Sequence, residues 1–87
     1  MTVTNNERRQ QFEVRSGDYL AELQYRIREG KMYFLHTGVP KPLAGQGIAS
    51  KLAKTALTYA NEHKYEIVVY CPFVKGYLER HPEYLNK

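Results

Sequence analysis

The sequence has a single cysteine, Cys71, no apolar run long enough to cross a membrane and no apolar segment near its start. One cysteine excludes an intramolecular disulfide and a zinc site built from several cysteines. A membrane helix needs about 20 mainly apolar residues, and a secretory signal needs an apolar centre, which the polar start MTVTNNERRQQ does not have. These absences predict a soluble protein of the cytoplasm with no membrane partner.

The chain also lacks internal repeats, low-complexity segments and linkers between domains. Its 87 residues, of which 43% are hydrophobic, are enough for one modest core and too few for two. Residues 1–11 show no apolar period and are predicted to form a flexible N-terminal arm, so that residues 12–87 form the single domain. The formal net charge of +4 favours anionic partners in general, among them coenzyme A, nucleic acid and acidic surfaces.

A turn with two glycines and the amphipathic helix that follows it occupy residues 43–60. Apolar side chains recur in the helix at steps of three and four residues. The members of this face are Ala49, Leu52, Ala53, Ala56, Leu57 and Ala60. Gly45 and Gly47 free the backbone ahead of the helix, where the first N–H groups have no partners within the helix and carry partial positive charge. The N–H groups of residues 46–49 could therefore hold a pyrophosphate.

A Gly-x-Gly pair by itself is more often a plain loop before a helix than a ligand site. A dinucleotide-binding fingerprint needs a third glycine, but Ser50 stands in its place, and Glu66 opens a strand instead of ending one. The lysine and hydroxyl pair of a Walker motif is missing as well. The glycine turn therefore belongs to neither of these nucleotide-binding classes.

The remaining segments read as strands and one more helix. The predicted strands are residues 12–15, 19–28, 31–37 and 65–71, and the predicted second helix is residues 74–80. Turns at residues 16–18 and 29–30 join the first three strands into an antiparallel meander. A strand, helix, strand passage places the last strand parallel to the third, with the helix across one face. The predicted fold class is α/β (α+β), a mixed, mainly antiparallel sheet of about four strands with two helices.

Polar and reactive residues gather at one edge of this predicted sheet. The ends of the third and fourth strands and the glycine turn meet there, which brings His36, residues 45–49 and Cys71 into one neighbourhood. Ligand sites in α/β sheets occupy such carboxyl ends of strands. His63 and His81 have no metal-like spacing with His36, so no metal site is predicted.

The segment VPKPLAGQGIASKLAKTAL resembles the acetyl-CoA pyrophosphate loop and following helix of GNAT acetyltransferases, whose pattern is Gln/Arg-x-x-Gly-x-Gly/Ala. HTGVP before the turn and VVYCPFVKGYLERHPEY after the helix resemble a family of very short, single-domain GNAT-like proteins, and the similarity covers residues 19–84. Gly45 and Gly47 match the glycines of the pattern. Pro42 stands where larger GNAT enzymes have Gln or Arg, and Leu78 stands where they often have a tyrosine that protonates the departing CoA thiolate.

The resemblance implies an N-acetyltransferase that uses acetyl-CoA as its acyl donor and acetylates a primary amine. The pyrophosphate would rest on the glycine turn, and the pantetheine arm would lie between two splayed parallel strands with its thioester towards Cys71. The residues expected to contact acetyl-CoA or CoA are Val39, Gly45, Gln46, Gly47, Ile48, Ala49 and Cys71. The acceptor is left open between a small molecule and a protein lysine, and the oligomeric state between monomer and homodimer.

Cys71 and His36 are the candidate catalytic residues. From its position alone, Cys71 reads more simply as a small buried residue at a strand end. The short GNAT-like family carries a cysteine there, which implies that Cys71 either accepts the acetyl group as a thioester or lines the pocket while the amine attacks directly. His36 could act as general base for the amine or for Cys71, because imidazole exchanges protons near neutral pH, or it could be a strand-end histidine bonded to backbone.

Two other functions fit parts of the sequence. A non-catalytic acyl-CoA-binding or sensing module would keep the fold without turnover, which agrees with Pro42 and Leu78. A nucleic-acid-binding domain would combine the basic charge with stacking aromatic rings, but such rings are more often core residues, and no RNP or KH motif is present. Acetyl transfer is the leading hypothesis, and nucleic acid is not expected as a partner.

Overall fold

Five strands form one sheet, in the order in which they occur along the chain. The computed structural model describes residues 2–85, so residues 1, 86 and 87 of the predicted arm and domain lie outside the described part. The strands are β1 (Thr4–Asn6), β2 (Gln11–Ser16), β3 (Tyr19–Arg28), β4 (Lys31–Gly38) and β5 (Glu66–Val69). Neighbours from β1 to β4 are antiparallel, whereas β5 is parallel to β4. The predicted mixed, mainly antiparallel sheet is confirmed, with five strands in place of about four.

The additional strand lies in the segment predicted to be a flexible arm. Thr4–Asn6 pair with Gln11–Glu13 at the edge of the sheet, and the Asn5 side chain accepts a hydrogen bond of 2.7 Å from the hydroxyl of Tyr25. The arm prediction was therefore wrong for this strand. Its three polar residues carry no apolar period, and they are ordered by backbone pairing with a neighbouring strand, which periodicity does not report.

The two predicted turns of the meander are both present. Gly17 has a φ of 60° between β2 and β3, and Glu29 and Gly30 have φ values of 51° and 77° between β3 and β4. Two consecutive residues with positive φ are typical of the tight turns that match the twist of paired strands. Both hairpins are thus set by local turn chemistry.

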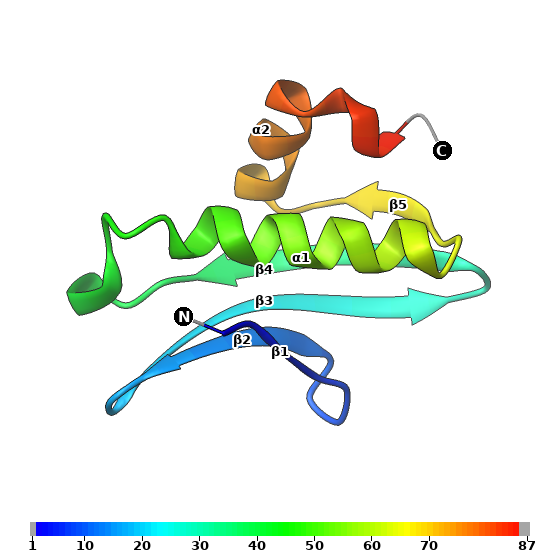
Figure 1. Cartoon of the computed structure of the whole chain (residues 1–87). Helices are drawn as coiled ribbons and strands as arrows, with labels where there is room; N and C mark the ends of the chain where they lie inside the picture. The colour runs from blue at the N-terminus through cyan, green and yellow to red at the C-terminus, as the bar shows by residue number, and fades with distance from the viewer. Residues whose placement is uncertain (1, 86–87) are drawn as a thin grey trace.

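One face of the sheet is covered by α1 (Ile48–Glu62), and α2 (Pro72–Arg80) packs against α1, β4 and β5 (Figure 1). Short 3-10 helices, η1 (Lys41–Leu43) and η2 (Pro82–Leu85), precede α1 and follow α2. The side chains that α1 buries are Ile48, Leu52, Ala53, Ala56, Leu57 and Ala60. Within residues 2–85, neither helix combines the length and the apolar character needed to cross a membrane.

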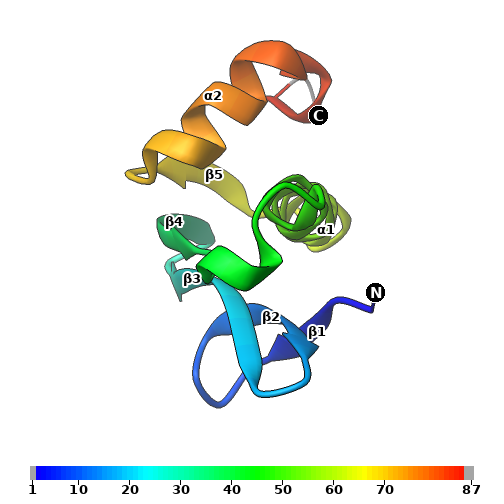
Figure 2. The same ribbon diagram turned by 90° about the vertical axis from the view of Figure 1, so that its left-hand side faces the viewer.

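In the described part of the chain, residues 2–85, no helix lies over the opposite face of β3 and β4 (Figure 2). We call it the open face of the sheet. The core lies on the other side, where buried side chains of β2, β3 and β4 meet α1 and α2. The strand, helix, strand passage from β4 through α1 to β5 has the predicted parallel arrangement.

Burial of three tyrosines predicts loss of stability at alkaline pH. Desolvation raises the pKa of Tyr25, Tyr59 and Tyr77, since the charged phenolate is disfavoured inside the fold. The unfolded chain releases these protons near pH 10, so the stabilisation is complete below that pH and is lost as the pH rises further. Thermal unfolding followed by circular dichroism from pH 8 to 11 measures this loss; Tyr25→Phe should reduce the slope, and Tyr19→Phe, at an exposed ring, should leave it unchanged.

Candidate functional site

The candidate site is built where β4 and β5 part. Their parallel pairing runs from Lys31–Glu66 to Phe34–Val69 and stops there, although β4 continues to Gly38. The backbone N–H groups of Tyr70 and Cys71 both donate to the carbonyl of Phe34, at 2.9 and 3.1 Å. Residues 35–38 of β4 are then paired only with β3, while the chain after β5 turns into α2. We call this point the β4–β5 fork.

A β-bulge in β4 coincides with the fork. Tyr25 is paired with Phe34 and Gln24 with His36, so that Leu35 is an extra residue on β4. Because side chains alternate between the two faces of a strand, one extra residue exchanges the faces of all residues that follow. Thr37, opposite the buried Leu23, therefore shares the helix-covered face with Phe34, and the exposed His36 lies on the open face.

Cys71 lies buried at the fork, on the helix-covered side. Its thiol sulfur is 3.2 Å from the hydroxyl oxygen of Thr37, and only 3% of the residue is exposed. Cys71 is also the residue before α2, with Pro72 at the first helical position and no acidic residue in the first turn. The helix N-terminus places partial positive charge beside the sulfur, which stabilises negative charge at this position. Thr37 was not among the predicted site residues, because only the bulge turns its hydroxyl towards Cys71.

The glycine turn, residues 44–47, leads into the N-terminus of α1. Gly45 and Gly47 have φ values of 82° and 74°, and a Cβ atom added to either would meet no atom within 4 Å. No side chain caps the helix, and its first backbone bond is donated by Lys51 to the carbonyl of Gly47 at 3.1 Å. The N–H groups ahead of Lys51 are thus free of helical acceptors, and the space beside Gly45 and Gly47 is open. This is the arrangement expected for an anion site.

Buried neighbours hold the glycine turn in place. Leu43 is 4% exposed and Ile48 is 2% exposed, so that apolar anchors flank the exposed glycines on both sides. Val39 is half-buried and packs against the core between the end of β4 and η1. Gln46 is exposed and its amide donates a long bond of 3.5 Å to the carbonyl of Pro42. The predicted acetyl-CoA contacts other than Cys71 thus lie between Val39 and the first turn of α1, where Ala49 is half-buried.

Comparison with known proteins agrees with this geometry. The sequence model of GCN5-related N-acetyltransferases matches residues 11–87. The chain belongs to this family. It is 31% identical to human protein NATD1 and 29% identical to NATD1 of Xenopus tropicalis, in each case over 98% of this chain and over 80% and 83% of the relatives. A solution structure of a GCN5-like protein from Staphylococcus aureus superimposes with a TM-score of 0.74 and 31% identity, covering 95% of this chain and 82% of that one.

Members of this family transfer acetyl groups, and their usual donor is acetyl-CoA. The site is therefore compared with what this reaction requires. The first turn of α1 contains no acidic side chain, and Lys51 and Lys54 are exposed on the same helix. Positive charge from the helix N-terminus and from the lysines therefore surrounds the glycine turn without opposing carboxylates in that turn of helix. Negative charge is favoured at this end of α1.

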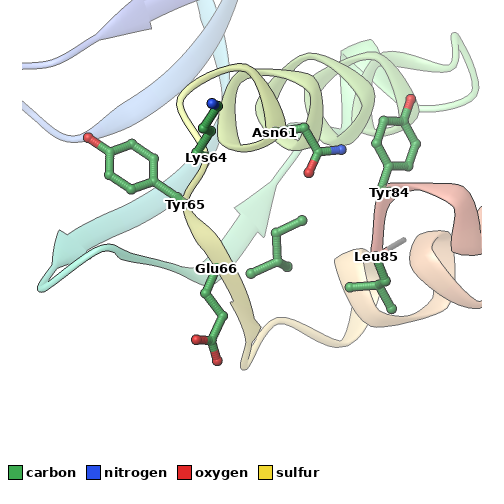
Figure 3. Close-up of a pocket in the computed structure, with 7 residues that line it drawn as sticks. Asn61, Lys64, Tyr65, Glu66, Tyr84 and Leu85 are labelled. Carbon is green, nitrogen blue, oxygen red and sulfur yellow. The ribbon is translucent and has the colours of Figure 1, made fainter. Parts of the chain in front are cut away.

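A cavity of about 650 Å³ lies at the C-terminal end of α1, at the opposite end of the helix from the glycine turn (Figure 3). Its lining comes from the end of α1, the start of β5 and η2: Asn61, Lys64, Tyr65, Glu66, Ile67, Tyr84 and Leu85. At 1.5 Å per residue, the length of α1 separates it from the glycine turn by about 20 Å. None of the predicted site residues borders it.

Proposed function

We propose that the protein is an acetyl-CoA-dependent N-acetyltransferase that acetylates a primary amine. One observation carries this proposal: the uncapped N-terminus of α1, with its two open glycines, and the Cys71 thiol lie at the same carboxyl end of the parallel strands β4 and β5. A phosphate group and a thioester at the two ends of one donor match these two features.

The backbone supplies most of the proposed donor contacts. The N–H groups of residues 46–49 would hold the pyrophosphate, and the exposed edge of β4 from the bulge to Val39 would hold the extended arm of the donor. Gly45 and Gly47 matter because a Cβ atom at either would project into open space that the pyrophosphate would occupy. Placing the donor and the amine together accounts for most of the expected rate acceleration, since it converts a bimolecular reaction into one within a complex.

Cys71 has two possible roles in this proposal. In the first, the Cys71 sulfur attacks the thioester carbonyl, a new carbon–sulfur bond forms, and coenzyme A leaves with the electron pair of the broken bond and the proton of the thiol. The amine then removes the acetyl group from Cys71. In the second, Cys71 only borders the thioester and the amine attacks the donor directly. The contact with Thr37 and the adjacent N-terminus of α2 support the first role, because both stabilise negative charge on sulfur.

A second candidate function is binding of acyl-CoA without turnover. Leu78 is 6% exposed and packs in the core, so this position offers no acid to protonate the departing thiolate. Such a module would bind the donor with the same glycine turn. Detection of acetyl transfer to any amine would exclude it.

Thermal unfolding with added acetyl-CoA tests the donor site directly. A ligand at about 100 times its Kd stabilises the folded state by about 2.7 kcal/mol, and each kcal/mol raises the Tm of a domain of this size by about 4–8 °C. We expect a saturable rise with acetyl-CoA and CoA that exceeds the rise with ATP. An absent rise at millimolar acetyl-CoA would contradict both CoA-dependent functions.

Gly47→Ala should weaken this binding at least about tenfold, because its Cβ would project into the open space in front of the turn that the pyrophosphate would occupy. Gly30→Ala is a matched control, since Gly30 has nearly the same φ, 77° against 74°, and lies in the β3–β4 turn. Both variants carry a similar backbone strain of about 1–2 kcal/mol. Titration calorimetry then separates lost affinity from lost stability, and equal affinities for the two variants would contradict an anion site at the glycine turn.

A further inference from the structure

The open face of the sheet carries a carboxylate beside the β4–β5 fork. Glu22 of β3 is paired with Gly38, the last residue of β4, and its side chain lies over that glycine. A Cβ atom at Gly38 would be only 2.9 Å from the Glu22 carboxylate oxygen Oε1. Gly38 directly follows Thr37 in β4. The Thr37 hydroxyl contacts the Cys71 sulfur on the helix-covered face of the sheet. The carboxylate thus lies on the open face over the residue that follows Thr37, while Cys71 lies on the helix-covered side.

Glu22 is half-buried, and among residues 2–85 its carboxylate has no hydrogen-bond or ion-pair partner. Its cross-strand neighbour Glu13 differs, because a Glu13 oxygen accepts hydrogen bonds from the side chains of Asn6 and Gln11. A partly desolvated carboxylate without a partner favours a cation that can both neutralise it and donate hydrogen bonds. Glu22 therefore offers a binding group that Glu13 does not.

The open face offers an approach to the fork that the packed helix-covered side does not. The helix-covered side is filled by core side chains of β4, α1 and α2, including Phe34, Ile48 and Val74. No helix of the described chain covers β3 and β4 on the opposite side (Figure 2). An acceptor amine that approaches the fork from the open face passes the half-buried Glu22 over Gly38.

Charge along the open face is divided in a way that orients such an acceptor. Glu13 and Glu22 lie opposite each other at the fork end of the open face, with the exposed Arg15 of β2 beyond them. Arg26, Arg28 and Lys31 lie towards the other end, where Glu66 of β5 is paired with Lys31. The net charge of these groups is therefore negative at the fork end and positive at the far end. At about 3.3 Å per residue, Glu22 and Arg28 are about 20 Å apart along β3. A cationic group is attracted to the end at the fork and repelled from the far end.

We propose that Glu22 binds the ammonium group of the acceptor amine and so positions it at the fork. This inference rests on the proposed acetyltransferase function and assigns a positioning residue for its acceptor. A small amine and a lysine side chain both carry a primary ammonium group on a flexible chain, so Glu22 would bind either by the same contacts.

His36 completes the proton balance on the same face. It lies two residues before Gly38 on β4, opposite Gln24, and its exposed ring shares the open face with Glu22. The ammonium gives one proton to His36, the free nitrogen forms the bond to the acetyl carbon, and the carbon–sulfur bond breaks with its electron pair on sulfur. The nitrogen loses a second proton, which the sulfur takes up, so that one proton leaves through His36 to solvent.

The test compares Glu22→Gln with Glu13→Gln in an acetylation assay using two amines. Butylamine is a cation at neutral pH, whereas aniline is neutral. We expect Glu22→Gln to raise the KM for butylamine about tenfold, without raising that for aniline. Glu13→Gln should change either KM less than about twofold, because the Glu13 carboxylate is already held by Asn6 and Gln11. Equal effects of the two variants, or an unchanged KM for butylamine in Glu22→Gln, would overturn the inference.

A second variant keeps the test decisive if Glu22→Gln does not fold. Gly38→Ala leaves Glu22 in place but puts a Cβ 2.9 Å from its carboxylate oxygen, so the carboxylate must move. The KM for butylamine should therefore rise, as it does in Glu22→Gln.

Acetyl-CoA binding, measured by thermal shift, separates the acceptor inference from the proposed function. Wild-type protein that binds acetyl-CoA but transfers acetyl to aniline as readily as to butylamine overturns the acceptor inference alone. Binding of acetyl-CoA with transfer to neither amine overturns both proposals and favours the non-catalytic acyl-CoA-binding module. Absence of acetyl-CoA binding overturns the proposed function.

Discussion

Replacing Cys71 with alanine is expected to lower the rate of acetyl transfer to an amine at least about a hundredfold, because the nucleophile of the proposed two-step route is removed. The affinity for acetyl-CoA should change less than about threefold, since backbone groups of the glycine turn supply most of the proposed donor contacts. The loss of one buried sulfur atom should cost about 1 kcal/mol of folding stability, so the variant should remain folded. A large rate effect with intact affinity would distinguish chemistry at Cys71 from a structural role.

Intact-protein mass spectrometry gives the second measurement of this prediction. Wild-type protein incubated with acetyl-CoA should gain one acetyl group, which butylamine then removes, and Cys71→Ala should gain none. Thr37→Ala is a useful companion variant because it removes the hydroxyl 3.2 Å from the sulfur and leaves the thiol in place. We expect it to slow transfer by about tenfold or less, in line with the loss of one hydrogen bond to developing charge. If Cys71→Ala kept a rate within a few fold of the wild type, direct attack of the amine on acetyl-CoA would be the route instead.

Much of the fold follows from local patterns in the sequence. The three- and four-residue spacing of apolar side chains predicts α1. The turn-forming residues at 16–18 and 29–30 predict the hairpins of the meander, and the structure has positive φ values there. The parallel placement of β5 follows from the handedness of strand, helix, strand connections. Each of these features depends on neighbours in the sequence or on a rule with few exceptions, which explains why it could be predicted from one chain.

The features that shape the candidate site depend on pairing between distant residues, and these were not predicted. The extra residue Leu35 is defined only by the register of β4 against β3. That single residue turns Thr37 towards Cys71 and His36 towards the open face, so that the predicted neighbourhood is divided by the sheet. The position of Glu22 over Gly38 likewise depends on cross-strand pairing. The residue types alone indicated Cys71, His36 and the glycine turn as candidate site residues. They did not indicate on which face of the sheet each side chain lies.

The separation of His36 from Cys71 bears on the proposed chemistry. A histidine on the helix-covered face could have taken the thiol proton, whereas on the open face it is placed to take a proton from an incoming amine. Thioester exchange at Cys71 needs no net proton acceptor, because the departing sulfur takes up the proton that the attacking sulfur releases. The amine step does need one, since a cationic amine must lose a proton before its nitrogen can attack. In the proposed route, Cys71 thus lies on the helix-covered face of the sheet, and His36, the proton acceptor for the amine, lies on the open face.

Phe34→Ala should have the largest effect on stability, lowering the free energy of unfolding by about 3–5 kcal/mol. Its side chain is fully buried, and its carbonyl accepts the N–H groups of Tyr70 and Cys71 where β5 leaves the sheet. For a domain whose total stability is of the order of 5–15 kcal/mol, this loss should bring much of the protein close to its unfolding midpoint. Phe34→Leu should cost about 1.5 kcal/mol or less because it keeps apolar bulk, and Tyr19→Ala, at an exposed ring, less than about 1 kcal/mol. Urea unfolding followed by circular dichroism measures all three, and a Phe34→Ala variant as stable as Tyr19→Ala would contradict a core centred on the β4–β5 fork.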